Sequence, residues 1–177
     1  QLPVMTGVFN QACVRHAQYF GQQYTTRKTI RPDDLPRFLS LESDNLLNGV
    51  SRGQARDAFD CCRAAVYYFQ IHGPIASGVE TAAAYLKRED ISEDARRQIR
   101  LEKSICLRYS GALEEADNIL VDLSAQLLSS AVQNGVRNHT ESDLFNESSF
   151  KMEILRQRGI IEEQRSNFSV AITFFLE

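Results

Sequence analysis

The chain has 177 residues and a formal net charge of -3, a size that suits one domain with a packed core. Hydrophobic residues make up 43% of it, close to the average of globular proteins, which excludes a globally disordered chain. The slightly acidic balance argues against a nucleic-acid-binding protein, and no apolar run reaches the ~20 residues that cross a membrane.

The first 49 residues predict a pair of helices. The first helix covers residues 3–20 and ends at Gly21, because its apolar side chains recur at helical spacing up to that glycine. A polar loop over 22–31 follows, and a second helix ends at Gly49. Because no repeat signature marks this part of the chain, residues 1–49 are predicted to form an N-terminal helical cap.

Residues 52–177 predict three further helix pairs. The helices of these pairs cover 52–72 with 75–88, 93–109 with 112–131, and 149–165 with 168–177. Gly73-Pro74 is a clear stop and restart within the first pair, since glycine ends helices and proline suits their first turn. A polar stretch over about 134–148 predicts a long loop between the second and third pairs.

These pairs carry small residues at recurring offsets. The second half of the second pair opens with Gly111-Ala112-Leu113-Glu114-Glu115-Ala116, and Gly159 and Ala171 stand at matching offsets in the third pair. This pattern resembles the tetratricopeptide repeat, a helix-turn-helix in which small residues let the two helices touch. The other residues at repeat offsets are Leu155 and Phe175 in the third pair, Ser104, Leu107 and Leu120 in the second, and Cys62, Ala65, Phe69, Gly78 and Ala82 in the first.

The resemblance covers residues 52–177 and implies an all-α fold, with antiparallel helix pairs stacked as a short α-solenoid. An irregular α-helical bundle with the same turns is the structural alternative.

In tetratricopeptide proteins the first helix of each pair lines a groove that binds a partner. The resemblance therefore implies a protein-protein interaction scaffold, or adaptor, that binds a partner peptide or helix. Counting offsets places these residues toward the groove: Arg63, Tyr67, Gln70, Leu101, Ile105, Arg108, Arg156, Ile160 and Glu163. Tyr67 stands where the chaperone-binding members carry the first asparagine of a carboxylate clamp, so that class of ligand is not expected.

Known catalytic motifs are missing from the sequence, which has no phosphate loop, no Gly-x-Ser-x-Gly and no His-Glu-x-x-His. Cys13 and His16 have the spacing of a zinc-binding pair, but no second pair completes it and both lie on an apolar helix face. We therefore expect no enzyme activity, metal or cofactor. A helical regulatory domain of a larger enzyme or signalling ATPase is the alternative, followed by a helical enzyme whose site is assembled from scattered residues.

The cysteines indicate the compartment. Cys13, Cys61, Cys62 and Cys106 all fall among apolar neighbours in predicted helices, as free thiols do in a reducing environment. Residues 1–10 lack the charged start and long apolar segment of a signal peptide. We expect an intracellular protein, cytoplasmic or nuclear, that does not bind membranes.

The last predicted helix, 168–177, is apolar on more than one side. Phe175 can face its own helix pair, but Phe174 then points about 100° away. Because solenoids cover their last apolar face with a polar helix, we expect a fragment of a longer protein. Further helices, or a second copy in a homo-oligomer, would then cover Phe174 and Leu176.

Overall fold

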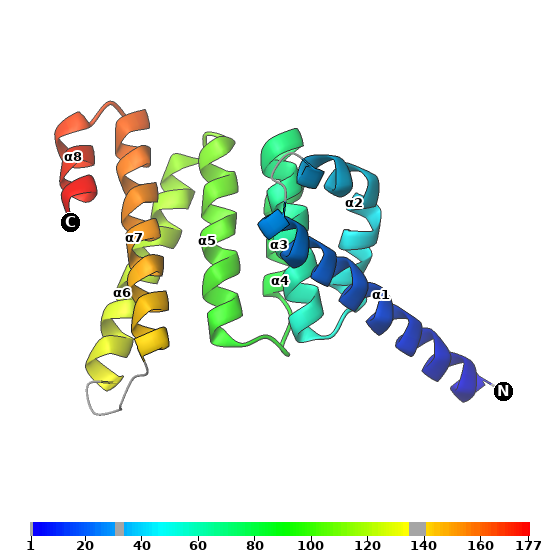
Figure 1. The fold of residues 1–177 in the computed structure, drawn as a ribbon. Coiled ribbons are helices and arrows are strands. Elements are labelled where there is room, and N and C mark those ends of the chain that lie inside the picture. Colours follow the sequence, from blue (N-terminus) through cyan, green and yellow to red (C-terminus); the bar gives the residue numbers. More distant parts are fainter. Residues whose placement is uncertain (1, 31–33, 135–140) are drawn as a thin grey trace. The chain divides into compact units, whose positions relative to one another are not determined.

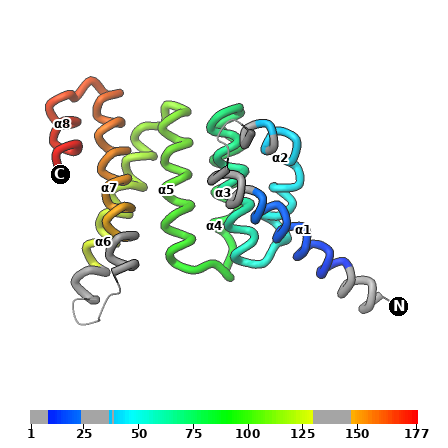
Figure 2. Tube along the Cα trace, in the orientation of Figure 1, coloured from blue at the N-terminus to red at the C-terminus, as the bar shows by residue number. Residues whose placement is uncertain are grey.

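The structure is a computed structural model that describes residues 2–30, 34–134 and 141–177, and within these ranges it contains eight α-helices and no strand (Figure 1). Two compact units divide the chain, Gln1–Ser110 and Gly111–Glu177. The first unit contains α1 (Leu2–Ile30), α2 (Asp34–Arg52), α3 (Ala55–His72), α4 (Ile75–Leu86) and α5 (Glu93–Tyr109). The second unit contains α6 (Leu113–Asn134), α7 (Glu141–Gln164) and α8 (Phe168–Leu176). The fold is all-α, and within each unit successive helices pack against each other (Figure 2).

Helix α3 is the centre of the first unit, because α1, α2, α4 and α5 all pack against it. Its approach to α1 and α2 is close: a Cβ atom built on Gly49 would lie 2.5 Å from Cys61 Sγ, and one on Gly21 would lie 3.0 Å from the Asp60 Cβ. Larger residues fill the space around this crossing. The core contains Ala17 of α1, Leu39 and Leu46 of α2, Val66 and Phe69 of α3, Tyr85 of α4 and Ile99 of α5.

The end of α2 is held by a side chain that follows α4. Arg88 Nη1 donates to the carbonyl of Val50 and Arg88 Nη2 donates to the carbonyl of Gly53, both at 2.8 Å. Asp90 fixes the same guanidinium with two bonds, from Nε at 2.9 Å and from Nη2 at 2.7 Å. Because the last carbonyls of a helix lack partners within the helix, Arg88 supplies the donors that cap α2.

In the second unit, α7 packs against both α6 and α8, and the chain direction reverses at each connection (Figure 1). The inward face of α6 is aliphatic at helical spacing. Among the described residues of this unit, the buried ones other than Gly159 are Ala116, Leu120, Leu123 and Leu127 of α6, Ile154, Gln157 and Ile161 of α7, and Ala171 of α8. Gln157 is satisfied in this core, since its Nε2 donates to Glu153 Oε1 at 2.8 Å.

The turn between α7 and α8 has the hydrogen bonds of a Schellman motif. Asn167 N donates to Glu162 O at 2.8 Å, and Ser166 N donates to Glu163 O at 2.9 Å. This geometry places Ser166 at φ 63°, in the left-handed region that favours glycine. The predicted break at Arg165-Ser166-Asn167 is confirmed.

Several predicted boundaries are confirmed, and others are wrong for a common reason. The helix over 93–109 and the break at Gly73-Pro74 appear as predicted. The ends predicted at Gly21 and Gly49 are wrong, because α1 continues to Ile30 and α2 to Arg52. Both glycines are buried where their helices cross α3, so they allow close approach and do not end a helix.

The compact units do not follow the predicted domain boundary. Helices α1 and α2, which cover the predicted N-terminal cap, share one core with α3, α4 and α5, and the units divide at Ser110-Gly111. Part of the predicted loop over 134–148 is helical, because α7 already begins at Glu141. Acidic residues at 141 and 143 favour a helix start there, next to the positive end of the helix dipole. Residues 135–140 lie outside the described residues.

Candidate interaction surfaces

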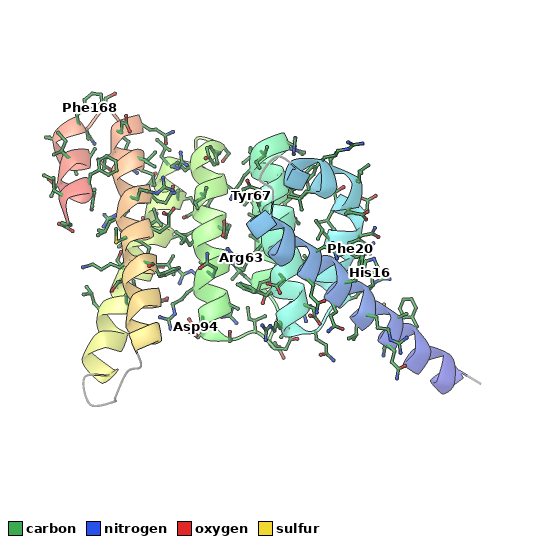
Figure 3. The ribbon with its side chains drawn as sticks, in the orientation of Figure 1. His16, Phe20, Arg63, Tyr67, Asp94 and Phe168 are labelled. Carbon is green, nitrogen blue, oxygen red and sulfur yellow. The ribbon has the colours of Figure 1, made fainter. Side chains whose placement is uncertain are left out.

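Three of the predicted groove residues stand on α3, and Figure 3 labels two of them, Arg63 and Tyr67. Arg63, Tyr67 and Gln70 are half-buried and stand at i, i+4 and i+7. Arg63 Nε lies 3.6 Å from Glu102 Oε1 of α5, and Gln70 Nε2 donates to Cys106 Sγ of α5 at 3.6 Å. The structure thus brings this face of α3 against α5.

The predicted groove residues on α5 are mostly covered. Leu101 and Arg108 are buried, with 2% and 8% of their surface exposed. The guanidinium of Arg108 stacks over the ring of Tyr109, 4.3 Å from its centroid. Ile105 alone among the three predicted α5 residues is partly exposed. Leu101 and Arg108 therefore present almost no surface to a partner in this structure.

The remaining three groove candidates lie on α7, in the second unit. Arg156 is exposed and forms two hydrogen bonds with the carboxylate of Glu153, at 2.7 and 2.8 Å. Glu163 is also exposed, whereas Ile160 is half-buried. The nine predicted residues are thus divided between two units, six in the first and three in the second.

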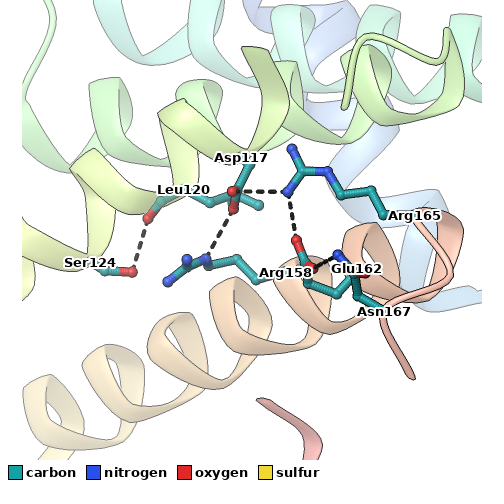
Figure 4. Close-up of polar contacts among 7 residues, drawn as sticks. All are labelled: Asp117, Leu120, Ser124, Arg158, Glu162, Arg165 and Asn167. Carbon is teal, nitrogen blue, oxygen red and sulfur yellow. Dashed lines mark hydrogen bonds and ion pairs between the residues drawn. The ribbon is translucent and has the colours of Figure 1, made fainter. Parts of the chain in front are cut away.

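A polar network joins α6 to α7 in the second unit (Figure 4). Asp117 accepts hydrogen bonds from Arg158 Nε at 3.0 Å and from Arg165 Nη1 at 3.3 Å. Arg165 Nη1 also donates to Glu162, which accepts a further bond from Asn167 Nδ2 at 2.7 Å. The hydrogen bonds from Asn167 and Arg165 lower the pKa of Glu162. This network positions α7 and the turn before α8, so its role is structural.

The two predicted C-terminal interface residues differ in their surroundings. Phe174 is half-buried, and the guanidinium of Arg158 stacks over its ring at 4.5 Å from the centroid. Leu176 is 82% exposed. Phe175 faces α7 as predicted, since a Cβ atom on Gly159 would lie 2.6 Å from its Cε1. Arg158 therefore covers the side of α8 that carries Phe174, and the exposed apolar surface lies on another side.

That exposed surface is a row of three side chains, Phe168, Ile172 and Leu176, which we name the outer row. They stand at i, i+4 and i+8 of α8 and are 61%, 57% and 82% exposed. At 100° per residue, Ile172 lies about 160° around the helix from Phe174. The outer row therefore faces away from the contact with Arg158.

Phe168 and Ile172 are not among the residues predicted from the sequence. The sequence does contain a signal for them, because Phe168, Ile172 and Leu176 recur at the spacing of one helix face. However, the only polar residues of α8 are Ser169 and Thr173, so apolar side chains point in almost every direction around the helix. Such a pattern does not show which side the fold covers.

Exposed apolar side chains concentrate on α8. Among the described residues, eight of the fourteen large hydrophobic side chains that are exposed belong to the second unit, and five of the eight stand on this nine-residue helix. Scattered exposed hydrophobics are ordinary, but a contiguous apolar surface marks an interaction site. The α8 surface therefore carries the clearest signal of binding in the described part of the chain.

The cysteines do not form a reactive site. All four are free thiols, and Cys61, Cys62 and Cys106 are buried. Burial raises the pKa of Cys61 to about 12 and that of Cys106 to about 11, and it also raises the pKa of Cys62. Since the thiolate is the nucleophile and the metal ligand, these three thiols are unreactive in the folded state.

His16 has a packing role at the crossing of α1 and α2. His16 Nε2 is hydrogen-bonded to Asn45 Oδ1 at 3.0 Å, and its ring lies 4.7 Å from that of Phe20. Over the described residues, no three or more His, Cys, Asp or Glu side chains are grouped closely enough to hold a metal ion.

The chain has no match among protein-family models, curated proteins or solved structures. Among the described helices, none has the length and apolar character needed to cross a membrane. The only support for the candidate surfaces is therefore the geometry of the described residues.

Proposed function

We propose that this chain is a protein-protein interaction scaffold, of the helical-repeat kind that the sequence resembles, and that α8 is its binding element. The single observation that carries this proposal is the exposure of Phe168, Ile172 and Leu176 along one side of α8. Each exposed apolar side chain that a partner covers contributes about 25 cal/mol per Å² of surface removed from water. The ligand that fits such a row is the apolar face of another helix.

The proposal moves the binding surface from the predicted groove to α8. The groove candidates Leu101 and Arg108 are buried, and Arg63 and Gln70 already contact α5. The outer row, in contrast, consists of apolar side chains that are more than half exposed. We also place the scaffold inside the cell, in the cytoplasm or nucleus, which agrees with its four free thiols.

Site-specific photo-crosslinking tests the proposal. Phe168 is replaced by the photoreactive aromatic residue benzoylphenylalanine, which preserves its apolar character, and the protein is irradiated in cell lysate. A covalent adduct with a polypeptide is expected at this position. Val170 is the matched control, because it is 45% exposed on the same helix but points about 160° away from Phe168. Equal crosslinking from positions 168 and 170 would contradict the proposal.

A further inference from the structure

We propose that the helix which binds the outer row is α8 of a second copy of this chain, in an antiparallel pair with twofold symmetry. This inference rests on the proposed function, because it names the partner of the same surface. The row spans eight positions, about 12 Å of helix. With Ile172 on the twofold axis, Phe168 of each copy packs against Leu176 of the other, so the same contact forms twice.

The charges around α8 favour a neutral partner and this orientation. No residue from Phe168 to Leu176 is charged, so two copies of this helix meet without repulsion. In the antiparallel pair Glu177 lies beside Asn167 of the second copy. A parallel pair would instead bring the two Glu177 carboxylates together and align the helix dipoles, and both effects oppose association.

The residues beside the outer row allow close approach. Ser169 and Thr173 are exposed on its polar flank, and their small side chains leave room for a second backbone. The hydroxyl of Thr173 already donates to the carbonyl of Ser169 at 3.2 Å. Because this hydroxyl has a partner within its own helix, removing it from water leaves no donor unsatisfied.

The available area reaches what a specific interface needs. Phe175, which is 51% exposed, adjoins the outer row on the side nearest α7. The row and Phe175 together expose on the order of 500 Å² of apolar surface. Complete burial of this surface in both copies would remove at most about 1,000 Å² from water, which is near the lower limit of specific interfaces. We therefore expect a weak dimer, in equilibrium with monomer at micromolar concentrations.

Sedimentation equilibrium of residues 1–177 tests the dimer. Ile172→Asp should weaken association at least about 100-fold, because it places two carboxylates on the twofold axis. Val170→Asp introduces the same charge at an exposed position on the other side of α8 and should leave the association constant within about twofold. Circular dichroism establishes that both variants are folded.

Charge reversal tests the symmetry. Ile172→Lys alone should also be monomeric, but an equimolar mixture with Ile172→Asp should associate, because the unlike charges then face each other. Cysteine crosslinking gives a second measure in a Cys13→Ser background, where the other native thiols are buried. Ile172→Cys should form a disulfide-linked dimer at least about tenfold faster than Val170→Cys.

The outcomes separate this inference from the proposed function. A wild-type chain that stays monomeric at several hundred micromolar overturns the inference. If position 168 still crosslinks to other polypeptides in lysate, the scaffold proposal stands with a different partner. Dimers that persist in Ile172→Asp, or equal crosslinking from positions 170 and 172, would also overturn the antiparallel pair.

Discussion

Gly159→Ala should destabilise the second unit, although alanine forms helices better than glycine. A Cβ atom on Gly159 would lie 2.6 Å from Cε1 and 2.7 Å from Cζ of Phe175. Carbon atoms in contact are about 3.5–4.0 Å apart. The aromatic ring must therefore shift away from Gly159 to accommodate a single methyl group.

The expected loss follows from the contact of the ring with α7. Phe175 is 51% exposed, so about 100 Å² of its side chain is buried. Complete displacement would cost about 2.5 kcal/mol, which is an upper limit because the ring can retain part of its contact. The better helix propensity of alanine returns about 1 kcal/mol. The net loss for Gly159→Ala should be about 1 kcal/mol, and for the larger Gly159→Leu about 1–3 kcal/mol.

A double-mutant cycle measures this contact. The three atoms nearest to the new methyl group all belong to this ring, so in a Phe175→Ala chain Gly159→Ala should stabilise by about 0.5–1 kcal/mol. Urea unfolding followed by far-UV circular dichroism measures the unfolding free energy of each of the four proteins in the cycle. All six tyrosines lie within residues 1–110 and the chain has no tryptophan, so tyrosine fluorescence reports the first unit separately. If Gly159→Ala changes the unfolding free energy by the same amount with and without Phe175, the predicted contact is refuted.

Three further predictions concern single side chains. Because hydrogen bonds lower the folded-state pKa of Glu162, this carboxylate stabilises the fold above its unfolded pKa of about 4.3, and the contribution disappears as the pH falls through the folded value. Glu162→Gln should thus lose stability less steeply below about pH 4.5 in acid titrations followed by circular dichroism, and parallel curves would contradict this. Ser166→Gly should raise the unfolding free energy by about 0.5–1 kcal/mol, since glycine adopts φ 63° without strain. An unfolding free energy at or below that of the wild type would contradict strain at this turn. Thiol reagents should modify Cys13 first and the three buried cysteines only on unfolding, so a fast phase that persists in Cys13→Ser would disprove the assignment.

Local signals in the sequence were sufficient where a helix end depends on neighbouring residues. Gly73-Pro74 ends one helix and starts the next whatever the surroundings. Ser92 caps α5, because its hydroxyl accepts a hydrogen bond from Ala95 N at 3.2 Å. Gly21 and Gly49 could not be interpreted in this way. Their function depends on α3 crossing them, and that contact joins positions far apart in the chain.

The proposed binding surface was harder to predict for a similar reason. Offset counting placed Leu101 and Arg108 in a groove because it assumed regular repeats, and the structure buries both. On α8, the stacking of Arg158 over Phe174 decides which side of the helix is covered. Arg158 stands 16 positions earlier in the sequence, so the spacing of apolar residues within α8 carries no information about it.

The contacts of Arg88 have a consequence for folding during synthesis. The bond to the Val50 carbonyl joins positions 38 residues apart, so α2 must be made long before its last carbonyls acquire their donor. At typical translation rates this interval is about 2–8 s. During that time the end of α2 depends on water and on its neighbours for hydrogen bonds. The end of α2 is therefore capped only after α4 and Arg88 have also left the ribosome.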